Sequence, residues 1–317
     1  MMTVDALDAF LSGPRARGAF LLRSIMSPPW SIRIEDRAPL TVVVLARGDA
    51  WIVPDGGEPH ELGAGDIALV RGPDPYLVAD RPGTPPQVVI HPGQRCTTVA
   101  GQSVPESMDL GVRTWGNDSD GASVMFTGTY QADGEVSRRL LTVLPTLIVL
   151  RHDEWDCPLI PVLSTEIVKN QPGQEAVLDR LLDLVVIAAL RTWFGRTDAP
   201  GWYRAHADPV VGPALRLLHN DPARPWTIAA LAGEVGISRA ALARRFHDLV
   251  GEPPIAYLSG WRMTLAADLL REPDATVGSV ARKIGFASPF TFSTAFKRHY
   301  GMSPQQYRSG PTDAPAA

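Results

Sequence analysis

Short apolar runs alternate with turn residues between positions 30 and 90. Runs of this length, rich in β-branched side chains, predict the strands of an antiparallel barrel or sandwich. Clusters of Gly, Pro and Asp separate them, as in Pro54–Gly57 and Gly72–Pro75. The predicted strands are Trp30–Ile34, Leu40–Leu45, Ala50–Val53, Asp66–Val70 and Gln87–Ile90.

The spacing of apolar residues then changes to that of helices. Residues Arg138–Arg151 and Gln174–Phe194 both follow a helical period, and the second run contains no Gly or Pro. The segment Gly195–Pro209 mixes Gly, Pro and charged residues, which is typical of a linker. These patterns predict that helices flank the strand-rich region and that a linker ends it.

The last hundred residues contain an internal repeat with a period of about fifty. In each copy a threonine precedes an amphipathic run that ends at a glycine, a pattern that predicts an N-capped helix with a left-handed C-cap. Thr227 and Gly236 bound the first copy, and Thr276 and Gly285 bound the second.

A second helix follows each of these glycines. Ser238 and Ser288 are the expected N-caps, and Gly251 and Gly301 end the two helices. Helix, tight turn and helix form the helix-turn-helix pattern, in which the second helix enters the major groove of DNA. A single copy fits any helical hairpin as well, but two copies favour the DNA-binding interpretation.

Charge separates the two halves of the chain. Residues 208–310 carry twelve Lys and Arg against eight Asp and Glu, a net charge of about +4, whereas the whole chain has −4. The predicted phosphate-contacting residues lie on the two second helices. They are Ser238, Arg239, Arg245, Ser288, Lys297 and Arg298.

The segment Val280–Arg308 resembles the signature of AraC/XylS-type regulators, and the similarity covers about Asp208 to Gly310. The resemblance implies two helix-turn-helix units that read successive major grooves, with Ile255–Leu270 as a bridging helix. It places the base-reading positions at Ala240, Ala243, Arg244, Pro289, Phe290, Thr291 and Thr294.

Those positions offer different chemistry. Arg244 can hold the O6 and N7 atoms of guanine, whereas Ala240 and Ala243 offer apolar contact alone. Pro289 fits the first position of a helix better than a reading role, and Phe290 fits the core equally well.

The N-terminal half resembles cupin-type domains through Leu62–Val70 after a strand hairpin. Counted from Gly65, the family's metal-ligand positions hold Ile52, Pro54, Glu58 and Tyr76, so one carboxylate alone remains of the ligand set. One carboxylate is too few for a catalytic metal. We therefore expect no metal and no cofactor, and His60 and His91 as ordinary polar residues.

Three aromatic residues, Trp30, Trp51 and Tyr76, either fill the predicted barrel or line a pocket for a small effector. Cys96 and Cys157 are candidate redox sites. Arg95 is expected to lower the pKa of Cys96, and Asp156 to raise that of Cys157, although a small buried side chain is the favoured role.

Helix Gln174–Phe194 is a candidate dimer helix. In the family that this chain resembles, helices of the sensor half join two copies into a dimer. Packing on the chain's own barrel is the alternative. The candidate dimer residues are Leu178, Leu181, Leu182 and Val185.

Two cysteines are too few for a disulfide framework, and no apolar stretch reaches the length of a membrane span. We expect a soluble, cytoplasmic homodimer that binds double-stranded DNA and has no membrane partner. RNA polymerase is a possible partner at the promoter. The alternatives are an enzyme, a thiol switch protein and a non-DNA interaction module. The enzyme would be either a cupin oxygenase or a DNA-repair methyltransferase.

The predicted fold is a two-domain α+β chain. Residues 1–195 form a cupin-like antiparallel β-barrel with flanking helices that senses an effector and dimerises. Residues 196–207 are the linker, and residues 208–310 form an all-α domain with two helix-turn-helix units.

Overall fold

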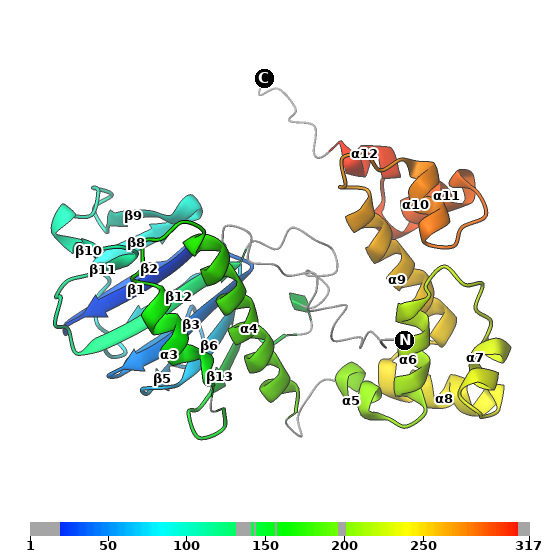
Figure 1. Cartoon of the computed structure of the whole chain (residues 1–317), viewed down its shortest axis with the longest axis horizontal. Coiled ribbons are helices and arrows are strands. Elements are labelled where there is room, and N and C mark those ends of the chain that lie inside the picture. The colour runs from blue at the N-terminus through cyan, green and yellow to red at the C-terminus, as the bar shows by residue number, and fades with distance from the viewer. Residues whose placement is uncertain (1–19, 131–140, 143, 156, 196–200, 310–317) are drawn as a thin grey trace. The chain divides into compact units, whose positions relative to one another are not determined.

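The computed structural model describes residues 20–130, 141–142, 144–155, 157–195 and 201–309. Two compact units divide the chain, one rich in strands and one helical (Figure 1). Each is described by itself below.

Two sheets form the N-terminal unit. The seven-stranded sheet has the order β10-β11-β1-β12-β3-β6-β13, and the six-stranded sheet has the order β5-β4-β7-β2-β8-β9. The strands of the first are β1 Phe20–Met26, β3 Leu40–Arg47, β6 Ile67–Arg71, β10 Asp109–Gly111, β11 Thr114–Gly116, β12 Ser123–Tyr130 and β13 Leu147–Leu150. Those of the second are β2 Ser31–Ile34, β4 Ala50–Pro54, β5 His60–Leu62, β7 Tyr76–Ala79, β8 Val88–His91 and β9 Arg95–Thr98.

All five predicted strands are confirmed, but the predicted barrel is not closed. Each sheet ends in edge strands, β10 and β13 in one and β5 and β9 in the other. Two of the pairings, β1 with β11 and β2 with β8, are parallel. The core lies between the sheets, where Leu45, Ile52 and Leu62 are fully buried.

The helical prediction for Arg138–Arg151 was wrong at its C-terminal end. Residues Leu147–Leu150 form β13, which pairs antiparallel with β6 from Leu147 opposite Val70 to Leu150 opposite Ile67. Residues 131–140 lie outside the described part of the chain. Pairing along β6 decides the structure of this short apolar run, and its periodicity alone does not.

Helices α3 (Leu159–Glu166) and α4 (Gln174–Phe194) pack against each other and on the seven-stranded sheet (Figure 1). Leu182 of α4 contacts β12 at Gly128, where a Cβ atom would lie 2.6 Å from a Leu182 methyl carbon. Gly128 therefore allows α4 to lie close to the sheet.

The C-terminal unit is all helical. Its helices are α5 Gly201–Ala207, α6 Val211–Asn220, α7 Ile228–Glu234, α8 Arg239–Val250, α9 Pro254–Leu269, α10 Val277–Lys283, α11 Pro289–Tyr300 and α12 Pro304–Arg308. Residues 201–207 were expected in the linker, but α5 contacts α6 and α8 and buries Ala205. The linker prediction was therefore wrong for these residues, because packing on α8 stabilises a helix there.

Candidate nucleic-acid interface

The first helix-turn-helix consists of α7 and α8. Thr227 Oγ1 accepts a hydrogen bond from Ala230 N at 3.1 Å, and Ser238 Oγ accepts one from Ala241 N at 3.2 Å, so both predicted N-caps are confirmed. Between the helices Gly236 has φ +73°, which a glycine adopts without steric cost. Leu242 and Phe246 bury the inner face of α8.

The second helix-turn-helix repeats this construction with α10 and α11. Thr276 and Ser279 form a capping box, and Ser288 Oγ accepts from Thr291 N at 3.2 Å. Gly285 has φ +83° in the turn. Phe292 and Phe296 of α11 are fully buried in a core separate from that of the first unit.

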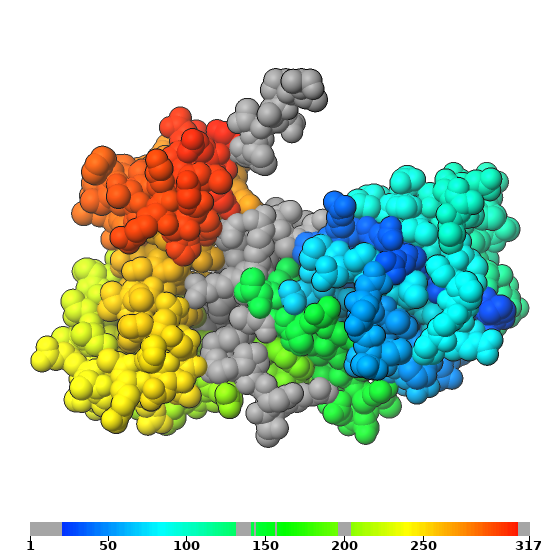
Figure 2. Space-filling model, turned by 180° about the vertical axis from the view of Figure 1, so that it is seen from behind, coloured from blue at the N-terminus to red at the C-terminus, as the bar shows by residue number. Residues whose placement is uncertain are grey.

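Helix α9 bridges the two cores, as predicted for Ile255–Leu270. Tyr257 and Leu258 belong to the first core, and Met263 and Ala267 to the second. Figure 2 shows α9 in gold between the first unit in yellow and the second in orange and red. One helix thus anchors both units.

Further contacts, which no local sequence pattern predicts, tie α9 and the second helix-turn-helix to the loop before α7. Arg262 Nε donates to Pro222 O at 2.6 Å, and its Nη2 donates to Arg224 O at 2.8 Å. At Gly285 a Cβ atom would lie 2.2 Å from Ala223 O, so the turn of the second unit lies directly against the loop that precedes α7. These contacts fix the spacing between α8 and α11.

The base-reading positions lie on the outer faces of α8 and α11. Ala240, Arg244, Thr291 and Thr294 are exposed, and Ala243 is half-buried. Phe290 is 80% exposed, so the core role considered for it was wrong. Pro289 occupies the first turn of α11, in agreement with its predicted role as a helix starter.

The cationic positions divide into two groups. Arg239, Lys297 and Arg298 are exposed, as a phosphate contact requires. Arg245 instead binds the carboxylate of Asp208 through Nε and Nη2 at 2.7 to 3.0 Å. Arg245 is also exposed, but its guanidinium is engaged within the domain, and we propose no phosphate contact for it. The serines Ser238 and Ser288 hold the N-caps with their hydroxyl oxygens.

The three aromatic residues of the predicted effector pocket do not line one cavity. A cavity of about 30 Å³ between the sheets includes Tyr76 in its lining, and a second of about 250 Å³ includes Trp30. Trp51 lines neither of these two. Because side chains alternate along β4, Trp51 faces away from the core that its neighbours Ala50 and Ile52 fill.

The four cupin ligand positions are scattered. Ile52 and Tyr76 are buried in the core, whereas Pro54 and Glu58 lie at and beyond the end of β4, with Glu58 exposed. In the described part of the chain no three His, Cys, Asp or Glu side chains come together as a metal-binding group.

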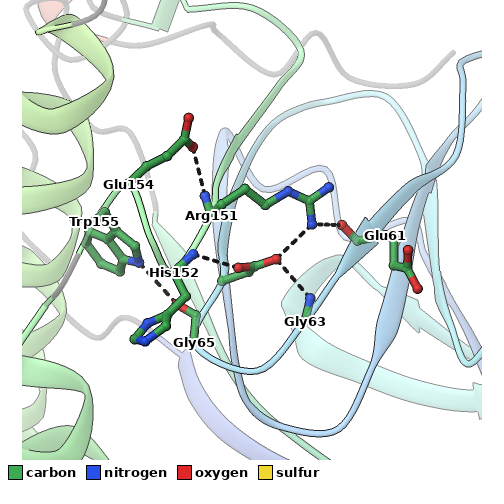
Figure 3. Close-up of polar contacts among 8 residues, drawn as sticks. Glu61, Gly63, Gly65, Arg151, His152, Glu154 and Trp155 are labelled. Atoms are coloured by element: carbon green, nitrogen blue, oxygen red, sulfur yellow. Dashed lines mark hydrogen bonds and ion pairs between the residues drawn. The ribbon is translucent and has the colours of Figure 1, made fainter.

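The motif at Leu62–Val70 forms a structural anchor. Asp66 is buried, and its carboxylate accepts hydrogen bonds from Gly63 N at 2.9 Å, His152 N at 2.8 Å and Arg151 Nη1 at 2.8 Å (Figure 3). Trp155 Nε1 donates to Gly65 O at 3.2 Å. The acid thus ties the segment after β13 to the β5–β6 turn.

The lowered pKa predicted for Cys96 was wrong. Burial raises the pKa of its thiol, opposite to the lowering expected from Arg95, and its Sγ donates to Gln94 O at 3.6 Å. Arg95 is exposed, so its charge is solvated and has little influence on the thiol. Cys157 is buried, and neither cysteine forms a disulfide within the described part of the chain.

The candidate dimer residues of α4 are largely turned inward. Leu178, Leu182 and Val185 are buried within the unit, so this part of the dimer prediction was wrong, and the alternative of packing on the chain's own sheet is confirmed for them. Leu181 is half-buried. Val177 and Leu184 are exposed by 45% and 48%.

Within the described residues, no helix has both the length and the apolar character needed to cross a membrane.

Comparisons with known proteins match both units. The cupin family model covers residues 5–195, and the helix-turn-helix domain model covers residues 231–310. A putative AraC-like transcription regulator of Streptomyces lividans is 30% identical over 98% of this chain and 99% of its own length. The HTH-type transcriptional regulator AlkR of Acinetobacter baylyi is 28% identical over 88% of this chain and 90% of its own.

A solved structure, the DNA-binding domain of AdpA in complex with a target DNA, is 31% identical, with a TM-score of 0.31. The match covers 32% of this chain and 91% of that domain. From the two repeated units and the full-length match to the Streptomyces lividans protein, this chain belongs to the AraC-like family of DNA-binding transcription regulators, with an N-terminal cupin domain.

Proposed function

We propose that α8 and α11 enter two successive major grooves of promoter DNA, and that the N-terminal unit controls this binding as a sensor and dimer module. The observation that carries the proposal is the equivalence of the two helices. Both are 12 residues long, begin at a serine N-cap and end at a left-handed glycine. Helix α9 and the contacts of Arg262 hold them at a fixed spacing.

The two helices carry different chemistry at equivalent positions. Arg244 lies six residues after the N-cap Ser238 and corresponds to Thr294, which lies six residues after the N-cap Ser288. A guanidinium donates two parallel hydrogen bonds to guanine and discriminates by about 1–3 kcal/mol. The proposed phosphate contacts are Arg239, Lys297, Arg298 and the capping serines Ser238 and Ser288. Such contacts set the affinity and carry little base preference.

Selection of DNA fragments by the full-length protein tests these roles. Arg244→Ala should relax the preference at one or two base pairs, whereas Lys297→Ala should weaken binding to all sequences and lower the salt slope by about 1. Wild-type affinity should fall about tenfold or more between about 50 and 200 mM salt. An Arg244→Ala profile identical to wild type would exclude the assigned reading helix.

For the effector we propose the cavity of about 250 Å³ rather than the smaller one, which has room for one or two water molecules. Its lining includes no charged side chain: Met26, Pro29, Trp30, Ser31, Ile32, Gln87, Val88, Thr98, Val104, Pro105, Met108 and Asn117. Trp30 Nε1 and Ser31 Oγ are buried and have no hydrogen-bond partner among the described residues. These features favour a small uncharged molecule with a polar group.

A thermal-shift screen of uncharged metabolites tests the cavity. Val104→Trp should fill it and abolish the stabilisation by a positive compound while DNA binding persists. A positive compound that still stabilises the variant equally would place the effector elsewhere.

We further propose that the protein is a homodimer and that it is not an enzyme. We propose that it works beside RNA polymerase in the cytoplasm. Val177, Leu181, Leu184 and Ala188 form a stripe on the outer side of α4, which we call the α4 stripe. Their spacings of four, three and four residues are those of a two-helix seam. A second copy of α4 would cover the stripe.

A further inference from the structure

Phe290 is the most exposed large hydrophobic side chain among the described residues, at 80%. The core of the second unit does not need it, because Phe292 and Phe296 from the same helix are fully buried there. An aromatic ring left in water on the outer face of α11 is available to a ligand.

The hydroxyl groups beside Phe290 are engaged by the helix itself. Thr291 Oγ1 donates to Ser288 O at 2.9 Å, and Thr294 Oγ1 donates to Phe290 O at 3.1 Å. Ser293 Oγ likewise donates to Pro289 O at 2.8 Å. A hydroxyl has one proton, so none of the three retains a donor for a base edge. The two threonines keep their methyl groups.

The equivalent face of α8 differs. Ala240 stands where Phe290 stands, and Arg244 stands where Thr294 stands. The first helix therefore offers five guanidinium donors, whereas the second offers a phenyl ring and methyl groups. On the major-groove edges of the base pairs, the apolar feature is the C5-methyl group of thymine.

We propose that α11 reads the C5-methyl groups of pyrimidines, with Phe290 as the main contact and the methyl groups of Thr291 and Thr294 beside it. Thymine is the expected base, and 5-methylcytosine presents the same group. Lys297 and Arg298, exposed on the following turn, bind the phosphates that flank these bases. This inference rests on the proposed entry of α11 into the major groove.

Replacement of single thymines by uracil in a selected duplex tests the inference, because the two bases differ by the C5-methyl group alone. We expect a loss of affinity of about fourfold for each contacted methyl group at one or two positions under α11. Replacement of such a T·A pair by C·G should also weaken binding, and 5-methylcytosine in that pair should restore the methyl contribution.

Phe290→Ala introduces the alanine that α8 has at the equivalent position, Ala240. It should remove most of the uracil effect under α11, because the threonine methyl groups remain, and should leave uracil effects elsewhere unchanged. Phe290→Leu is the matched control, because it keeps an apolar side chain and should retain part of the effect. Phe290 is exposed, so the unfolding midpoint of both variants should stay at the wild-type value.

The outcomes separate the two levels of the proposal. Failure of the full-length protein to select any DNA would overturn the proposed function. Selective binding with no uracil effect under α11, or with an effect that Phe290→Ala retains in full, would overturn the methyl reading alone.

Discussion

The guanidinium of Arg245 on α8 binds the carboxylate of Asp208, with Nη2 2.7 Å from Oδ2 and Nε 2.9 Å from the same oxygen. The same carboxylate accepts hydrogen bonds from the amides of Val210 and Val211 at 2.9 Å, at the start of α6. Asp208 thus joins the recognition helix to α6. A cation that sequence alone assigns to DNA is held by the fold instead.

Arg245→Ala should therefore lower the stability of the C-terminal domain and leave the salt slope of DNA binding unchanged. Lys297→Ala is the control, since loss of a phosphate contact lowers that slope by about 1. Urea unfolding and binding titrations at several salt concentrations measure the two effects. A reduced slope for Arg245→Ala would restore Arg245 to the phosphate contacts.

Asp208→Asn should destabilise the protein in a pH-dependent way. Burial acts to raise the pKa of Asp208, but the hydrogen bonds from Arg245 and the two backbone amides outweigh it and lower the pKa below its usual value. A group whose pKa is lower in the folded state stabilises the fold at pH values above its pKa in the unfolded state, which is about 3.9 for Asp. This stabilisation is lost as the pH falls through the folded-state pKa.

The stability difference between wild type and Asp208→Asn should be full at pH 6 and shrink below about pH 4. Unfolding midpoints across this range provide the measurement. The exposed Glu58→Gln serves as a control that removes one acid elsewhere. A difference that stays constant from pH 6 to pH 3 would contradict the assignment.

The two turn glycines should respond differently to alanine. Gly236 has φ +73° and open space around its Cβ position, so Gly236→Ala should cost about 1–2 kcal/mol of backbone strain. Gly285→Ala adds a clash with Ala223 O and should cost about 2–5 kcal/mol in total. Equal unfolding free energies for the two variants would exclude the close contact at Ala223.

Cys96 should react slowly with alkylating reagents near neutral pH, because burial raises the pKa of its thiol. In a Cys157→Ser background, the rate of iodoacetamide labelling should rise later with pH than that of a free cysteine peptide. Arg95→Ala should leave the profile unchanged. Faster labelling than the peptide at pH 7 would reinstate an activated thiolate.

Leu184→Arg should dissociate the proposed homodimer, since it places a charge in the middle of the α4 stripe. Val112→Arg is the control, because Val112 has similar exposure, 40% against 48%, on the β10–β11 turn. Sedimentation at several protein concentrations gives the oligomeric state. A Leu184→Arg protein that remains dimeric would exclude this face.

The sequence by itself determined the elements whose signals are local. The caps at Thr227, Ser238 and Ser288 and the left-handed glycines Gly236 and Gly285 depend on contacts within four residues, so the repeat predicted both helix-turn-helix units and the bridge between them. The five predicted strands had the same basis in alternation and turn residues.

Tertiary structure decided which faces those elements bury and with which residues they pair. The partner of Arg245 lies 37 positions away, and Gly285 of the second helix-turn-helix contacts Ala223 in the loop before the first. No local pattern reveals either contact. Leu178 and Leu184 share one amphipathic helix, yet packing on the sheet buries the first and leaves the second exposed. Long-range packing separates such residues because burial depends on neighbours that the chain brings together only when it folds.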